Sequence, residues 1–143
     1  MLDLFKKKNI SSENKKEQLL LKTASLLIHA AKIDENYTEK EIQIIKKTLI
    51  QLGINQSEIN KIMKEAEENE KNSNQILDFT REIKSSDENF KIKIIESLWT
   101  IIYSNEDADM YETNLMRRLS GLLYLDEKVV GEIKEKIKKN TSK

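Results

Sequence analysis

The chain has 143 residues and equal numbers of basic and acidic side chains, 25 of each, so its formal net charge is zero. This length fits one domain with an ordinary hydrophobic core, and the neutral balance provides no net field that would attract nucleic acid. The absence of cysteine excludes disulfides and thiolate metal sites and is typical of a reducing compartment. We therefore expect one cytoplasmic domain over residues 1–143, with a core from about 12 to 137 and no nucleic-acid partner.

The ends of the chain carry no apolar run long enough for a signal peptide or for a membrane span, which needs about 20 residues. Leu2, Leu4 and Phe5 stand beside three lysines at positions 6–8, a combination that can touch an anionic membrane. Because so short a segment buries little area, we favour a frayed or docked terminus over peripheral membrane contact. Residues 1–10 and 138–143 are expected to be mobile.

Helix formers dominate the chain, which has no proline and only three glycines. Apolar residues recur at steps of three and four along successive segments, so we predict an all-α fold of about seven helices in a single antiparallel bundle. The predicted helices run from Ser11 to about Ile33, from Thr38 to Gly53, from Asn55 to about Ala66, around Gln75 to Ile83, from Ser85 to a second acidic turn, from Asp109 to Leu123, and from Asp126 to about Ile137.

The starts of these helices show N-capping patterns, in which a side chain accepts a hydrogen bond from a free amide and a glutamate three residues later reaches back. The segment from Phe90 to Ile102 is apolar on most faces and should be the central helix. The charged run at 67–71 is expected to be a solvated helix end and loop. The predicted capping pairs are Thr38 with Glu41, Asn55 with Glu58, Ser85 with Glu88 and Asp109 with Glu112, and Asp126 caps the last helix.

Two acidic turns, at 34–41 and 105–112, are related by an offset of 71 residues. Each has an oxygen-bearing side chain at its first, third, fifth and eighth positions. The same offset aligns flanking residues, for example Ile28 with Trp99. We therefore predict an internal two-fold repeat of helix, acidic turn, helix.

The spacing of oxygen atoms in these turns suits a hard cation, Ca²⁺ before Mg²⁺. Neither turn is an EF-hand, because positions 6 and 12 counted from Asp34 hold Glu39 and Ile45. Helix capping and the attraction of acids to helix N-termini explain several of the same residues without any ion. A divalent-cation site and capping alone both remain open, and no other cofactor is expected. The candidate metal ligands are Asp34, Asn36, Glu41, Asn105, Asp107, Asp109 and Glu112.

Several segments resemble the TerB-like tellurite-resistance family of small bacterial all-helical proteins, over about residues 19–133. The resemblance implies about seven helices, a divalent-cation site built from turn acids, and a role in tellurite or general stress response. The same fold occurs in the N-terminal region of a DnaJ-type membrane co-chaperone. The family's turns usually read Asp-Gly, where this chain has Asp34-Glu35 and Asn105-Glu106. The segments that carry the resemblance are Leu26-Leu-Ile-His-Ala-Ala-Lys-Ile-Asp34, Thr38-Glu-Lys-Glu41, Glu96-Ser-Leu-Trp-Thr-Ile-Ile-Tyr103, Asp109-Met-Tyr-Glu112 and Leu115-Met-Arg-Arg-Leu119.

Catalytic patterns are missing from the sequence. There is no glycine-rich phosphate loop, no nucleophile elbow and no histidine dyad, so we expect no enzyme. The only histidine, His29, is expected to be partly buried and hydrogen-bonded, and without a second histidine or a cysteine it cannot build a zinc site. Trp99 and Tyr103, one helical turn apart, should pack in the core.

Two functional hypotheses follow from these observations. In the first, the chain is a cytoplasmic stress protein whose acidic turns bind a divalent cation and thereby change a surface for a protein partner. In the second, it is a metal-independent helical interaction module, an adaptor or scaffold of co-chaperone type, whose acids only cap helices.

Overall fold

Helices account for nearly all of the part of the chain that the computed structural model describes, which comprises residues 2–32, 37–73, 76–104 and 110–141. Side chains are described in these ranges except at 2–14, 110–113 and 141. The predicted all-α class is confirmed, since these ranges contain α-helices, one short 3-10 helix and no strand. The elements are α1 (Leu2–Ala31), α2 (Glu39–Gln51), α3 (Ile59–Asn72), α4 (Leu77–Thr80), η1 (Ile83–Ser85), α5 (Glu88–Ser104), α6 (Met110–Leu122) and α7 (Glu127–Thr141).

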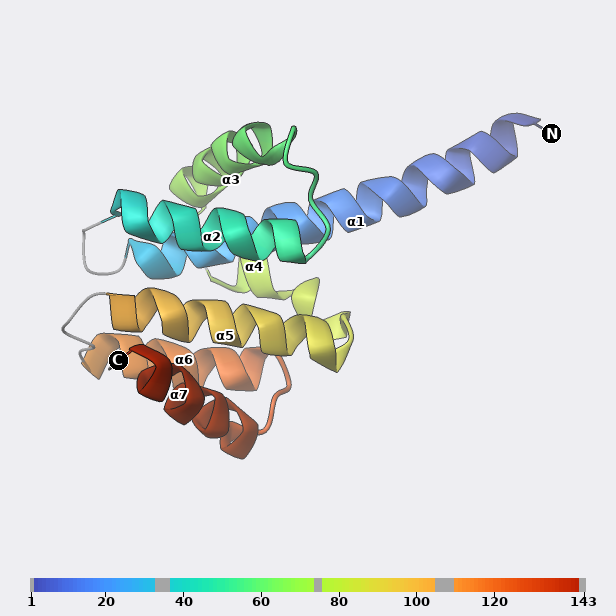
Figure 1. Ribbon diagram of the computed structural model, residues 1–143. Helices are drawn as coiled ribbons and strands as arrows, with labels where there is room; N and C mark the ends of the chain where they lie inside the picture. The colour runs from blue at the N-terminus through green and yellow to red at the C-terminus, as the bar shows by residue number, and fades with distance from the viewer. Residues whose placement is uncertain (1, 33–36, 74–75, 105–109, 142–143) are drawn as a thin grey trace.

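The helix α5 lies at the centre of the bundle, with α1 and α2 on one side and α6 and α7 on the other (Figure 1). It contacts α1, α2 and α7, while α1 packs chiefly against α3. The prediction of a central helix is therefore confirmed. The antiparallel order of the helices and the two-fold repeat stay predictions. Within the described ranges, no helix is both long and apolar enough to cross a bilayer.

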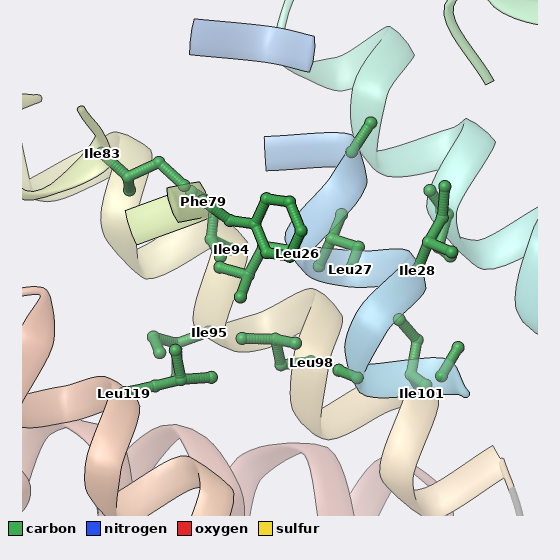
Figure 2. Close-up of a cluster of buried hydrophobic side chains, with 14 of the residues drawn as sticks. Leu26, Leu27, Ile28, Phe79, Ile83, Ile94, Ile95, Leu98, Ile101 and Leu119 are labelled. Carbon is green, nitrogen blue, oxygen red and sulfur yellow. The ribbon is translucent and has the colours of Figure 1, made fainter. Parts of the chain in front are cut away.

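The core is built mainly from aliphatic side chains of α1 and α5 that meet across the middle of the bundle (Figure 2). Phe79 of α4 and Ile83 of η1 close one end of this layer. Burying each such side chain contributes about 1.5–3 kcal/mol, so this layer is a large favourable term in folding. The labelled core residues are Leu26, Leu27 and Ile28 of α1, Ile94, Ile95, Leu98 and Ile101 of α5, and Leu119 of α6, all at most 1% exposed.

Two of the predicted caps are confirmed. At the start of α2, the Thr38 hydroxyl accepts from the Glu41 amide at 3.3 Å, and Glu41 Oε1 accepts from the Thr38 amide at 2.9 Å. At the start of α7, Asp126 Oδ1 accepts from the Lys128 amide at 3.0 Å. Asp109, the predicted cap of α6, lies outside the described residues.

The other two predicted capping boxes are wrong. The residue before α3 is Glu58, which makes no side-chain capping bond, and its own amide donates to the Asn55 carbonyl in a preceding turn. Ser85 belongs to η1, a 3-10 turn that begins at the buried Ile83 and is closed by the Ser86 amide donating to the Ile83 carbonyl at 2.9 Å. The cap of α5 is instead Asp87, whose Oδ1 accepts from the Phe90 amide at 2.8 Å.

Three helices are longer than predicted. The first begins at Leu2 instead of Ser11, and the last continues to Thr141. The charged run at 67–71, predicted to be a helix end and loop, is part of α3, which ends at Asn72. These segments are rich in lysine and glutamate and contain no proline or glycine, so no local signal ends the helix.

Candidate functional site

The predicted metal ligands fall largely outside the residues that the structure describes. Asp34, Asn36, Asn105, Asp107 and Asp109 lie between the described ranges. Glu112 lies in α6, where the structure describes its backbone but not its side chain. Glu41 is fully described.

The described residues on either side of the two acidic turns lie at one end of the bundle. The last residues of α1 and α5 and the first residues of α2 and α6 all reach this end (Figure 1). The two flanks also touch, because Lys40 Nζ of α2 lies 3.5 Å from the Ser104 carbonyl of α5. We call this region the turn end of the molecule. It joins segments that are about 64 residues apart in the chain.

Glu41 is a fully buried carboxylate at the turn end. Its Oε1 accepts from both the amide and the hydroxyl of Thr38, at 2.9 Å and 3.0 Å. The positive end of the α2 dipole further stabilises a negative charge at this position. Glu41 therefore has a structural role as the reaching residue of a capping box, in addition to any role as a ligand.

A second group of polar side chains at the turn end was missed by the sequence analysis. Lys32, directly before residues 33–36, donates to Glu70 Oε2 of α3 at 3.0 Å. Tyr37, directly after them, donates to Glu67 Oε1 of α3 at 3.1 Å. The Nδ1 atom of His29 is 3.3 Å from Glu70 Oε1, so the predicted hydrogen-bonded histidine is confirmed. We call these five residues the α1–α3 polar cluster.

The α1–α3 polar cluster joins the residues directly before and after 33–36 to α3. Its signal in the sequence is faint: His29 and Lys32 are three residues apart, as are Glu67 and Glu70, which is the spacing of neighbours on one helix face. The match between these pairs becomes visible only when α1 and α3 are packed together. The Lys32 ammonium also lies 5.6 Å from the centre of the Tyr37 ring, which links the two sides of the turn directly.

The electrostatics of the cluster act on the Tyr37 phenol. Burial raises its pKa, and the neighbouring negative charge of Glu67, which also accepts its hydrogen bond, raises it further. Both effects disfavour a phenolate. The phenol therefore stays a hydrogen-bond donor well above neutral pH.

The aromatic pair on α5 packs as predicted. The Trp99 and Tyr103 rings are stacked with centroids 6.0 Å apart, and the buried Trp99 indole donates to the Val130 carbonyl of α7 at 3.2 Å. Lys134 covers the indole with its ammonium 5.4 Å from the ring centre. These contacts account for both rings structurally.

The described side chains at the turn end form hydrogen bonds and ion pairs with one another. Among the described side chains, no three His, Cys, Asp or Glu residues lie close enough to hold a metal ion. A cation site would therefore need the acids of residues 34–36 and 105–109. Carboxylate and amide oxygens of this kind are chemically suited to a hard divalent cation.

Comparison with known proteins identifies the family. The family model described as tellurite resistance protein TerB matches residues 20–135, which is most of the chain. No curated protein and no solved structure matches the chain significantly. The match covers all the helices of the bundle from the buried part of α1 to the buried part of α7. The chain therefore belongs to the TerB family of tellurite resistance proteins.

Proposed function

We propose that this chain is a cytoplasmic, non-catalytic bacterial stress-response protein that binds a divalent cation, Ca²⁺ in preference to Mg²⁺, at its two acidic turns. Family membership supports the stress-response role. The seven candidate donors are carboxylate and amide oxygens, and Ca²⁺ takes six to eight such ligands. The proposed ligands are those predicted from the sequence, with Glu41 contributing while it caps α2.

The observation that carries this proposal is the contact between the flanks of the two turns. Lys40, near the end of the first turn, reaches the carbonyl of Ser104, which directly precedes the second. The first turn has three candidate ligand side chains and the second has four, so with one oxygen from each side chain neither turn alone reaches six ligands. Two turns whose flanks meet at one end of the bundle can share a single ion.

The α1–α3 polar cluster provides a route by which the ion would change a partner surface. Lys32, just before the first turn, and Tyr37, within it, are hydrogen-bonded to Glu70 and Glu67 of α3, respectively. A movement of the turn on cation binding would therefore shift α3 through these hydrogen bonds. The outer face of α3 exposes other polar side chains. We infer that α3 is the surface that a protein partner reads.

The test is the thermal midpoint of chelator-stripped protein, titrated with Ca²⁺ and separately with Mg²⁺ at constant ionic strength. A ligand that binds only the folded state adds about 2.7 kcal/mol at one hundred times its dissociation constant, which should raise the midpoint by several degrees. Asp34→Ala and Asp109→Ala should each abolish the saturable rise.

Asp126→Ala is the matched control for this titration. Asp126 caps α7 away from the turn end, so its removal should lower the midpoint through the loss of about 1 kcal/mol of capping and leave the Ca²⁺ response intact. A flat response of the unmodified protein to both cations would contradict the proposal. So would variants at Asp34 and Asp109 that respond to Ca²⁺ as fully as the control does.

A second candidate function is a metal-independent interaction module, an adaptor or scaffold. It is favoured by the Glu41 geometry, in which one carboxylate oxygen already accepts two hydrogen bonds from Thr38. In that case the acids of the turns cap helices only. Asp34→Ala and Asp109→Ala would then lower the midpoint equally in chelator and in calcium.

A further inference from the structure

The N-terminal part of α1 extends beyond the bundle (Figure 1). The helix is 30 residues long, or about 45 Å. Among its described side chains the first buried one is Leu20, and the four residues 15–18 before Leu19 are all exposed. The helix continues from there to Leu2 and projects away from the other helices (Figure 1). The backbone of the N-terminal part of α1 therefore lies away from the packed helices (Figure 1).

A helix without tertiary support is marginal in water when it is shorter than about 12–15 residues. The projecting part of α1 is about this length. We therefore expect its helical structure to be stabilised by contact with a surface outside this chain. The N-terminal end of this part combines apolar and basic residues. Leu2, Leu4 and Phe5 are followed at once by Lys6, Lys7 and Lys8, and Asp3 is the only acid among them.

We propose that residues 2–8 are a binding segment for an anionic lipid bilayer surface. The apolar residues would enter the boundary between headgroups and acyl chains, and the three lysines would lie among the lipid phosphates. Charge complementarity favours this ligand. Positive charge and large apolar residues fall within two turns of the same helix, and both bind an anionic membrane surface. The TerB domain would then be held close to the surface by α1.

The magnitude expected from this segment is moderate. Each lysine near an anionic surface improves partitioning roughly fivefold, so the three together give on the order of a hundredfold. The short apolar stretch adds to this, but a single weak anchor gives reversible binding. Binding should therefore be steeply dependent on the anionic lipid content and on salt.

The test is co-sedimentation of the full chain with vesicles of phosphatidylcholine alone and with vesicles containing about 30% phosphatidylglycerol. At low salt, partitioning into the anionic vesicles should exceed partitioning into the neutral ones by at least tenfold, and most of this difference should vanish in about 0.5 M salt. Equal partitioning into both vesicles would overturn the proposal. Failure to bind either would also overturn it and would leave a protein as the occupant of the segment.

Two variants and one control decide whether residues 2–8 are responsible. Replacing Lys6, Lys7 and Lys8 together by Gln should lower binding to anionic vesicles about a hundredfold, and Leu4→Ser with Phe5→Ser should lower it at least tenfold. The matched control is the triple replacement of three exposed lysines of α7 by Gln, which changes the net charge equally. Its effect should be less than threefold, and an equal loss in the control would overturn the proposal. The control lysines are Lys128, Lys136 and Lys138.

The variants keep this test interpretable. Residues 4–8 belong to the part of α1 that projects away from the bundle (Figure 1), and the control lysines are exposed, so each variant should melt at the midpoint of the unmodified protein. The vesicle assay is run with chelator present and then with Ca²⁺. Its outcome is therefore independent of whether the acidic turns bind a cation.

Discussion

Tyr37 shows how one residue links the first acidic turn to the rest of the molecule. Its phenol donates to Glu67 of α3 at 3.1 Å, and its ring lies beneath the Lys32 ammonium. Burial, followed by the charge of Glu67, raises the pKa of the phenol above its ordinary value of about 10. Tyr37 can therefore donate the hydrogen bond that joins the first acidic turn to α3 only while its phenol is protonated.

The raised pKa of Tyr37 predicts a specific loss of stability in alkali. Since the pKa is higher in the folded chain than in the unfolded chain, folding favours the protonated phenol. The corresponding stability is intact below about pH 10 and is lost as the pH rises above that value. Tyr37→Phe should reduce this alkaline loss, and it should remove the last phenolate to appear in an absorbance titration at about 295 nm.

Tyr124→Phe is the control for this pH dependence, because Tyr124 is 73% exposed. Its free energy of unfolding should fall with pH as steeply as that of the unmodified protein. At neutral pH, Tyr37→Phe should cost about 1 kcal/mol for the lost hydrogen bond. An alkaline profile of Tyr37→Phe that coincides with that of Tyr124→Phe would refute the assignment.

At the scale of elements, α2 is joined to the central helix by a buried polar contact as well as by apolar packing. The hydroxyls of Thr48 and Ser97 are 2.7 Å apart, and both side chains are buried. The Thr48 hydroxyl also lies 3.0 Å from the Ile44 carbonyl of its own helix, so it has a partner on both sides. This hydrogen bond joins α2 to α5 within an interface that is mainly apolar.

A double-mutant cycle should detect this contact. Thr48→Val and Ser97→Ala should each lower the free energy of unfolding by about 1–2 kcal/mol, because each leaves a buried hydroxyl with fewer partners or removes it. The double variant should cost less than the sum by about 1 kcal/mol. Denaturant unfolding measures all four proteins. Thr48→Val combined with Ser120→Ala, a buried serine bonded within α6, should be additive, and strict additivity in both pairs would exclude the contact.

At the scale of the whole molecule, the chain divides into a packed bundle and a projecting helix. The bundle is organised around α5, and every labelled residue of Figure 2 belongs to it. The exposed stretch at 15–18 marks where α1 leaves the bundle. The family match begins at residue 20, close to the same place. Stability should therefore reside in the matched region.

Removal of residues 2–14 should leave the free energy of unfolding within about 0.5 kcal/mol of the full chain, since surface changes away from packed features have small effects. The helical circular-dichroism signal should fall at the same time. Leu98→Ala, which empties part of the core, should cost about 2–5 kcal/mol in the same denaturant titration. A truncated chain as unstable as Leu98→Ala would show that the projecting helix supports the bundle.

Much of the fold was predictable because its causes are local. Apolar residues three and four apart determine which stretches become helices, and Thr38 with Glu41 forms its cap within four residues. The same local rules failed at Ser85, which lies in the 3-10 turn η1, and the cap is Asp87 instead. Lysine-rich and glutamate-rich ends contain no signal for where a helix stops, so the bounds of α1 and α3 were predicted too short.

The amino-acid sequence by itself determined the helical class, the central position of α5 and the candidate donors of the two turns. Only the tertiary structure decided which distant residues meet. The pairing of Lys32 and Tyr37 with Glu70 and Glu67 joins positions 30 or more residues apart, and so does the contact of Lys40 with Ser104. Such contacts depend on how whole helices pack, which is set by the summed burial of their apolar faces and not by any short pattern of residues.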